Sequence, residues 1–392
     1  MTKTVKRKSV SDGIAFTGKS WSYVLRVPDP TTGKTKPKWV GGFDTQQSAL
    51  LARDEARVAL RRHSYIAPTK VTLSVFLDQW IETHALRVKP TTLSSYRELI
   101  NNYLKPRLGS MPVQSIKASD IERFYSELIT TPGKSGHNLN PATAVRCIAI
   151  LKKALSYAEK VEGLITFNPA HRVSFPTVKA NRPTPWTFSE LNTFLELAKD
   201  HRLSFFFRLS AYTGARRGEL LALRWSDFDG KAVTISKSRT LAGRSVVEQN
   251  STKGGKGGQR RVALDPETVE LFRDHARRQR LERGEPETVI GNWNSAGFVF
   301  TQSDGVTPLD TGTPTKLFAK LAKKAGLRST RLHDLRHLHA TELLRLGEPL
   351  HVVSDRLGHR DPMVTATVYA HVSNEQGETA SNTFANASRS II

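Results

Sequence analysis

A few side chains in the last third of the chain have the types and spacing needed for chemistry on a phosphate group. His333 and Arg336 lie three residues apart in the segment 331–337, His359 follows in the sequence Leu-Gly-His, and Tyr369 comes after it. An imidazole moves protons, a guanidinium holds negative charge, and a phenol can act as a nucleophile. The combination predicts a site for phosphate chemistry.

A second arginine lies near the middle of the chain, in the sequence Thr-Gly-Ala-Arg-Arg-Gly-Glu-Leu. Arg216 and Glu219 are three residues apart, close enough to interact on a helix. The carboxylate would hold the guanidinium in place and leave its other donors for a phosphate. A surface ion pair is the alternative for this segment taken alone.

Two further candidates have weaker local signals. Lys253 lies on the glycine-rich segment 251–258, which is typical of a flexible hairpin tip, and Lys256 lies on the same loop. Such a lysine can reach a DNA groove or a leaving group, but it is more often only solvated. A free phenol titrates near ~10, so Tyr369 would need surrounding cations to act as a nucleophile. On its own it is more simply a packing residue.

The histidines also raise the question of a metal site. His333 and His337 are four residues apart, but zinc needs at least a third ligand, and the glutamate of a His-Glu-x-x-His motif is absent. The one cysteine, Cys147, cannot form an internal disulfide or a cysteine-rich cluster, and its apolar surroundings predict a buried residue. We expect neither a metal nor a cofactor.

The charge balance points to a polyanionic partner. The chain has 59 Lys and Arg against 36 Asp and Glu, a formal net charge of +23. Nucleic acid is the leading candidate, because an anionic membrane surface would call for a basic amphipathic anchor that the sequence lacks. No apolar run approaches the ~20 residues of a membrane span, and no apolar segment follows the basic N-terminus as in a secretory signal. We expect a cytoplasmic protein.

The elements that position these residues fall into three predicted domains. Residues 1–64 read as a small α+β module with strands at 20–27 and 38–43 and a helix at 45–62. Residues 65–172 read as a helical bundle. Residues 173–392 read as a mixed α/β domain with a C-terminal tail. In this domain we expect a capping box at Thr187 and Glu190, and short strands at 232–235, 245–248, 261–264 and 297–300.

In combination these motifs resemble the tyrosine recombinase family, specifically phage-type integrases. The resemblance rests on Thr-Gly-Ala-Arg-x-x-Glu, a hairpin lysine, His-x-x-Arg-His, Leu-Gly-His and Thr-x-x-x-Tyr, in that order over residues 180–375. It implies a mainly α fold with small β-sheets: a small α+β arm-binding domain, a helical core-binding bundle, and a mixed α/β tyrosine recombinase catalytic domain.

The resemblance also implies a role for each residue. Arg216 and Arg336 would hold the scissile phosphate, with Glu219 in support, and His359 would donate a hydrogen bond to it. Tyr369 would attack the phosphate with help from His333 and give a 3′-phosphotyrosine, while Lys253 would protonate the departing 5′ oxygen. Neither ATP nor a metal is required.

The resemblance further implies the partners. We expect double-stranded DNA attachment sites of core and arm type, a homotetramer on DNA, a host DNA-bending protein and an excisionase, with the enzyme at the bacterial host nucleoid. The predicted function is site-specific integration, and excision, of a mobile element. A type IB topoisomerase-like enzyme and a catalytically inactive DNA-binding regulator are the alternatives.

Overall fold

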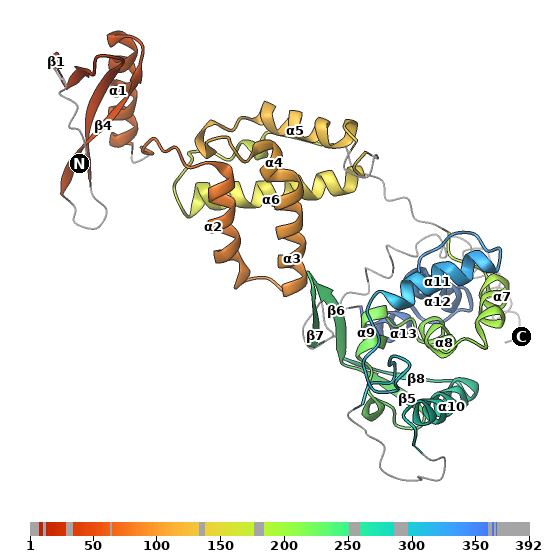
Figure 1. The fold of residues 1–392 in the computed structure, drawn as a ribbon. Coiled ribbons are helices and arrows are strands. Elements are labelled where there is room, and N and C mark those ends of the chain that lie inside the picture. The colour runs from red at the N-terminus through yellow and green to blue at the C-terminus, as the bar shows by residue number, and fades with distance from the viewer. Residues whose placement is uncertain are drawn as a thin grey trace, which may run out of the picture. The chain divides into compact units, whose positions relative to one another are not determined.

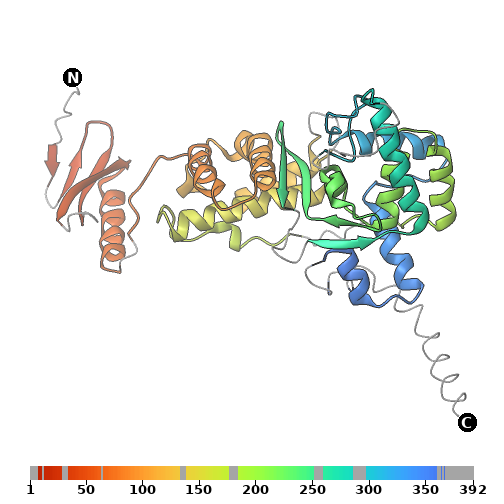
Figure 2. The same ribbon diagram turned by 90° about the horizontal axis from the view of Figure 1, so that it is seen from below.

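The computed structural model describes most of the chain, in two compact units that comprise residues 1–179 and 180–392 (Figures 1 and 2). The described residues are 8–10, 13–28, 34–62, 65–132, 138–175, 184–250, 259–285, 297–359, 363 and 366. Most of the buried apolar residues form three separate cores, one in each predicted domain. No helix within these ranges is long and apolar enough to cross a membrane.

The N-terminal module is a four-stranded antiparallel sheet with one helix against it. Its strands are β1 Lys8–Val10, β2 Ile14–Phe16, β3 Trp21–Pro28 and β4 Thr35–Phe43, in sequence order across the sheet. Helix α1, Gln46–Arg61, begins after the cap Thr45 and lies along the sheet (Figure 1). The two predicted strands and the helix are confirmed, and two short strands were missed. Tyr23 and Leu25 pack against Ala49 and Ala56 in the core.

The second module is helical, as predicted. It contains α2 Leu73–Ala85, α3 Pro90–Leu99, α4 Lys105–Leu108, α5 Ala118–Thr130 and α6 Pro141–Lys160. A π-helical turn, Ile100–Leu104, joins α3 to α4. Cys147 is fully buried in this core, which confirms the prediction, and burial raises the pKa of its thiol to about 11.

The second unit is built mainly from helices around one large core. They are α7 Phe188–Ala198, α8 Ser204–Thr213, α9 Arg217–Ala222, α10 Pro266–Glu282, α11 Thr313–Lys324, α12 Asp334–Arg345 and α13 Leu350–Leu357. Helix α8 contacts α7, α10 and α12. The predicted capping box is confirmed: the Glu190 amide donates to Thr187 Oγ1 at 3.2 Å, and the Thr187 amide donates to the Glu190 carboxylate at 2.7 Å.

Two small sheets belong to this unit. Strand β5, Ala232–Ile235, pairs with β8, Arg260–Ala263, and β6, Lys237–Ala242, pairs with β7, Ser245–Asn250. The three predicted strands in this region are confirmed, and β6 was missed. The tip at 251–258 lies outside the described residues.

The predicted strand at 297–300 is wrong. Phe298 forms only an isolated bridge with Arg224. The Trp225 amide donates to Gly297 O at 3.0 Å and the Val299 amide donates to Leu223 O at 2.9 Å. The opposite segment, which contains Arg224, then turns into a 3₁₀ helix, Trp225–Asp227, so the pairing cannot extend into a ladder.

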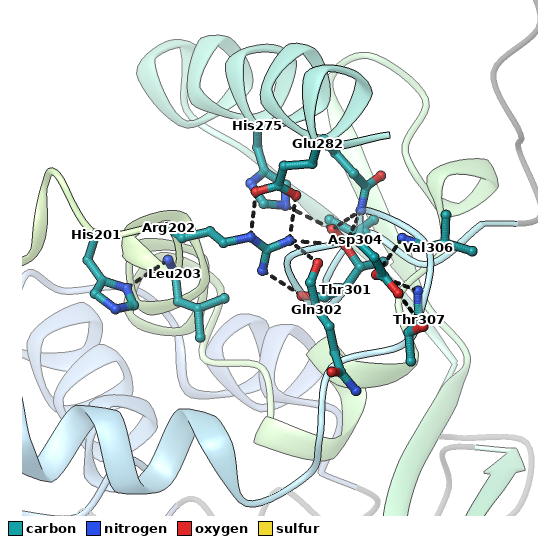
Figure 3. A network of polar contacts seen from close by, with 12 residues as sticks. His201, Arg202, Leu203, His275, Glu282, Thr301, Gln302, Asp304, Val306 and Thr307 are labelled. Carbon is teal, nitrogen blue, oxygen red and sulfur yellow. Dashed lines mark hydrogen bonds and ion pairs between the residues drawn. The ribbon is translucent and has the colours of Figure 1, made fainter. Parts of the chain in front are cut away.

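A partly buried polar network connects α10 to the segment after Val299 (Figure 3). Nε and Nη2 of Arg202 each donate to the Glu282 carboxylate at 2.5 Å, and Nη1 donates to Thr301 O at 2.6 Å. His275 lies nearby, its Nε2 2.8 Å from Val299 O, and its ring is surrounded by aromatic residues. Its Nδ1 has no hydrogen-bond partner among the described residues.

We predict that His275 makes the stability of this unit sensitive to acid. Burial lowers the pKa of His275 to about 4, against an ordinary value of 6.5. Between these two values the unfolded state binds a proton that the folded state does not, so stability falls as the pH falls. The expected contribution is about 1.4 kcal/mol per pH unit, and His275→Gln should remove it. Urea unfolding at several pH values between 7 and 5 measures this slope.

The matched control is His351→Gln, because His351 is exposed on α13. This variant should keep the slope of the parent protein. Parallel slopes for the parent and His275→Gln would contradict the prediction.

Candidate active site

Arg336 is the most deeply buried of the predicted phosphate-binding residues. It lies in the first turn of α12, and only 3% of it is exposed. Its Nη1 donates to Gly214 O at 2.8 Å, and its Nη2 donates to Leu357 O at 2.7 Å. The guanidinium is therefore fixed between the end of α8 and the end of α13. Carbonyl oxygens solvate its positive charge without neutralising it.

Two glycines allow these helix ends to approach Arg336. Gly214 ends α8 at φ 62° and Gly358 ends α13 at φ 67°, both in the left-handed region that favours glycine. A Cβ at Gly214 would lie 2.7 Å from the Leu357 side chain, and a Cβ at Gly358 would lie 2.8 Å from Arg260 Nη1. The glycines of Thr-Gly-x-Arg and Leu-Gly-His are thus required for both backbone angle and space.

Arg216 is held by a buried carboxylate. It is the N-cap of α9, where the Glu219 side chain accepts from the Arg216 amide at 2.9 Å and from its Nη1 at 2.8 Å. The Glu219 side chain is 1% exposed, whereas that of Arg216 is 37% exposed. The predicted pair is confirmed, and it is not the surface ion pair of the alternative. The anchor is buried and the guanidinium reaches solvent.

A second arginine completes the environment of Glu219. Arg260 Nη2 donates to its carboxylate at 2.7 Å, and Arg260 Nε donates to Arg356 O at 2.8 Å. Burial by itself raises the pKa of Glu219, but the Arg260 hydrogen bonds and the charges of Arg260 and Arg216 outweigh it. The pKa therefore lies below its ordinary value, and the carboxylate is charged at neutral pH.

The imidazoles of the site are neutral at pH 7. His333 is the N-cap of α12 and is exposed to solvent on one side, but the protein packed against the other side of its ring disfavours the charged form. Repulsion by His337, Arg336 and Arg216 adds to this, so its pKa falls to about 4. Burial and then the charges of Arg336, Arg216 and Arg260 lower the pKa of His359 to about 4 as well.

The same two arginines act on both imidazoles, which brings four of the predicted residues into one site: Arg216, His333, Arg336 and His359. His337 lies against His333, with ring centroids 5.2 Å apart and planes at 87°. Two fixed guanidinium groups and two neutral imidazoles suit a tetrahedral anion, because the arginines supply charge and each imidazole can donate or accept one proton.

The other two predicted catalytic residues, Lys253 and Tyr369, lie outside the described residues, as does Lys256, the alternative to Lys253. Within the described part of the chain, no group of three or more His, Cys, Asp or Glu side chains could hold a metal ion.

Sequence reasoning missed Arg260, and it missed the contact between Arg356 and His339, which the sequence alone presents as an ordinary surface or core histidine. Arg260 alternates in phase with the buried Val262 along β8, and this alternation was the available signal. Arg356 donates from Nε to His339 Nε2 at 3.0 Å and from Nη2 to Tyr212 O at 3.0 Å. Neither residue follows a local pattern that would have revealed this contact.

The domain organisation matches three family models. The phage integrase family model matches residues 184–376, the model of the phage integrase N-terminal SAM-like domain matches 72–129, and the arm DNA-binding domain model matches 14–59. The fold class of a small arm-binding domain, a helical SAM-like domain and a catalytic domain is thereby confirmed.

Whole-chain relatives agree with this. The XerC-like tyrosine recombinase of Caldanaerobacter subterraneus is 29% identical over 86% of this chain and 89% of its own length. The ICEBs1 integrase of Bacillus subtilis is 26% identical over 90% of this chain and 93% of its own length.

Solved structures share the fold. The Tn1549 transposon integrase in complex with circular intermediate DNA is 20% identical with a TM-score of 0.65, over 79% of this chain and 99% of that one. A lambda integrase dimer bound to a core site is 19% identical with a TM-score of 0.57, over 93% and 96%. The chain belongs to the phage integrase family and is a tyrosine recombinase, an enzyme that transfers DNA strands.

Proposed function

We propose that this recombinase integrates and excises a mobile DNA element through a 3′-phosphotyrosine intermediate. The observation that carries the proposal is the pair of fixed guanidinium groups, Arg216 on its buried carboxylate and Arg336 between two helix ends, beside two neutral imidazoles. Such a preorganised site stabilises the charge that develops on a phosphate during in-line displacement.

Each bond change has a proposed residue. Tyr369 attacks the phosphorus, a P–O bond to the phenol forms, and the P–O bond to the 5′ oxygen breaks. His333 assists removal of the phenol proton, because its ring is neutral at pH 7 and has a nitrogen lone pair to accept that proton. Arg216, Arg336 and His359 hold the phosphate oxygens, with Glu219 in support. Lys253 protonates the 5′ oxygen.

The reverse step completes the exchange. A 5′ hydroxyl of a partner strand attacks the phosphotyrosine, so one phosphodiester replaces another without ATP. We propose that four copies act together on two attachment sites at the bacterial nucleoid, with a DNA-bending protein and an excisionase. The lambda integrase tetramer bound to a Holliday junction, 19% identical with a TM-score of 0.55, supports the assembly by its fold.

We predict that the covalent intermediate depends on Tyr369. Full-length protein is incubated with nicked duplexes that tile the DNA flanking its coding sequence, so that the short cleaved strand diffuses away and traps the adduct. The parent should form a protein–DNA adduct and Tyr369→Phe none, while both retain the same DNA affinity. Adduct yields that do not differ would exclude this nucleophile, and cleavage with relaxation but no joining of paired sites would favour the topoisomerase-like alternative.

Lys253 should act as the acid for the leaving group. Lys253→Ala should slow adduct formation by about 10²–10⁴-fold. A duplex with sulfur in place of the bridging 5′ oxygen should restore the rate, because a thiolate leaves without a proton. Lys256→Ala is the matched control on the same loop and should behave as the parent on both substrates. Sulfur rescue of Lys256→Ala instead of Lys253→Ala would reassign the role.

The N-terminal module should bind arm-type sites that are separate from the core site. Deletion of residues 1–64 should abolish protection of the flanking repeats in footprinting and leave cleavage at the core site intact. Binding of both site types should weaken steeply with salt, because released counterions drive binding to DNA. Identical footprints for the full-length and truncated proteins would contradict the assignment.

A further inference from the structure

Arg260 joins two parts of the candidate site that are far apart in the sequence. Its Nη1 and Nη2 donate to the Glu219 carboxylate at 3.3 and 2.7 Å, and Glu219 in turn holds Arg216. Its Nε donates to Arg356 O at 2.8 Å, in the last turn of α13. One planar group therefore connects the start of α9 to the end of α13.

The guanidinium also packs directly on the backbone next to His359. A Cβ at Gly358 would lie 2.8 Å from Arg260 Nη1 and 3.0 Å from its Cδ, so this contact exists only because residue 358 is glycine. The next residue toward the N-terminus, Leu357, supplies the carbonyl that accepts from Arg336 at 2.7 Å. A displacement of this helix end would move His359 together with the Leu357 carbonyl that accepts from Arg336.

Arg260 cannot itself hold DNA, because its side chain is only 7% exposed and is occupied by these contacts. Without it, Glu219 would be a buried carboxylate with Arg216 as its remaining arginine. Both carboxylate oxygens would then attract Arg216, which would be drawn toward the protein interior and away from solvent. A buried charge that loses one partner is strongly destabilised, so the local structure should rearrange.

We infer that Arg260 is a positioning residue of the strand-transfer reaction, which sets Arg216 through Glu219 and sets His359 and Arg336 through the end of α13. This inference rests on the proposed function. Small displacements of groups that hold the reacting phosphate have large kinetic effects, because an error of about 1 Å can slow a reaction ~10²-fold.

The test uses a nicked duplex on which the parent protein forms the covalent adduct. Adduct formation is followed over a single turnover at saturating DNA. The rate constant reports the geometry of the folded site, and the amplitude reports the fraction of folded protein. Because the rate constant is measured on the folded fraction alone, Arg260→Met should lower it by about 10²-fold, even where the amplitude also falls. Arg260→Lys keeps the positive charge but not the bidentate contact with Glu219. Its rate constant should therefore lie between those of Arg260→Met and the parent.

Arg202→Met is the matched control. Arg202 has the same chemistry in the same unit, since it pairs with Glu282 through both sides of its guanidinium and donates to a carbonyl, but it contacts none of the site residues described above (Figure 3). This variant should lower the amplitude or the thermal stability and leave the rate constant unchanged.

A double-mutant cycle tests the route of the effect. In a Glu219→Gln background the further change Arg260→Met should cost much less than in the parent, because part of its action passes through the carboxylate. If Arg260→Met keeps the parent rate constant, or loses amplitude alone, or if Arg202→Met slows the reaction equally, the inference is wrong. Absence of any adduct with the parent would instead overturn the proposed function.

Discussion

The site depends on one buried carboxylate. Glu219 is 1% exposed, and a charge at such a depth is stable only with close counter-charges. Arg216, three residues before Glu219, and Arg260, forty-one residues after it, supply these counter-charges. Since two cations surround one anion, the group keeps a net positive charge. The arrangement therefore fixes a guanidinium at the surface and leaves it attractive to a phosphate, which a simple ion pair would not achieve.

Arg336 is also fixed in place, but by backbone carbonyl groups instead of a carboxylate. Carbonyl oxygens of Gly214 and Leu357 accept from it, so the guanidinium is oriented while its charge persists. Burial, and then the positive charges around the rings, among them Arg336 and Arg216, lower the pKa of both His333 and His359 to about 4. The two guanidinium groups therefore keep their positive charge where an anionic substrate would bind. The two histidines are neutral and can accept a proton.

The sequence revealed the parts of the site that depend on local spacing. Arg216 with Glu219 and His333 with Arg336 lie within one helical turn, so their proximity follows from helix geometry. Arg260 was missed because its partner Glu219 is forty-one positions away, as the hydrogen bond between them records. Strand β6 was missed because its Lys-Ser-Arg-Thr sequence lacks an apolar alternation and its strand identity comes from pairing with β7. Local patterns cannot supply contacts whose partner lies outside the segment, whether that partner is the next strand of a hairpin or a residue forty-one positions away.

Three arginines of the second unit illustrate how burial divides structural from functional roles. Arg202 and Arg260 are 22% and 7% exposed, each donates to a carboxylate through two nitrogens, and each also reaches a carbonyl. Arg216 donates to its carboxylate through one guanidinium nitrogen only, and its side chain is 37% exposed. A guanidinium whose donors are occupied in the interior can only hold protein groups in place. A guanidinium that is anchored through one nitrogen leaves its other donors for a ligand. The anchor of Arg216 and the enclosure of Arg260 therefore depend on the same carboxylate, that of Glu219.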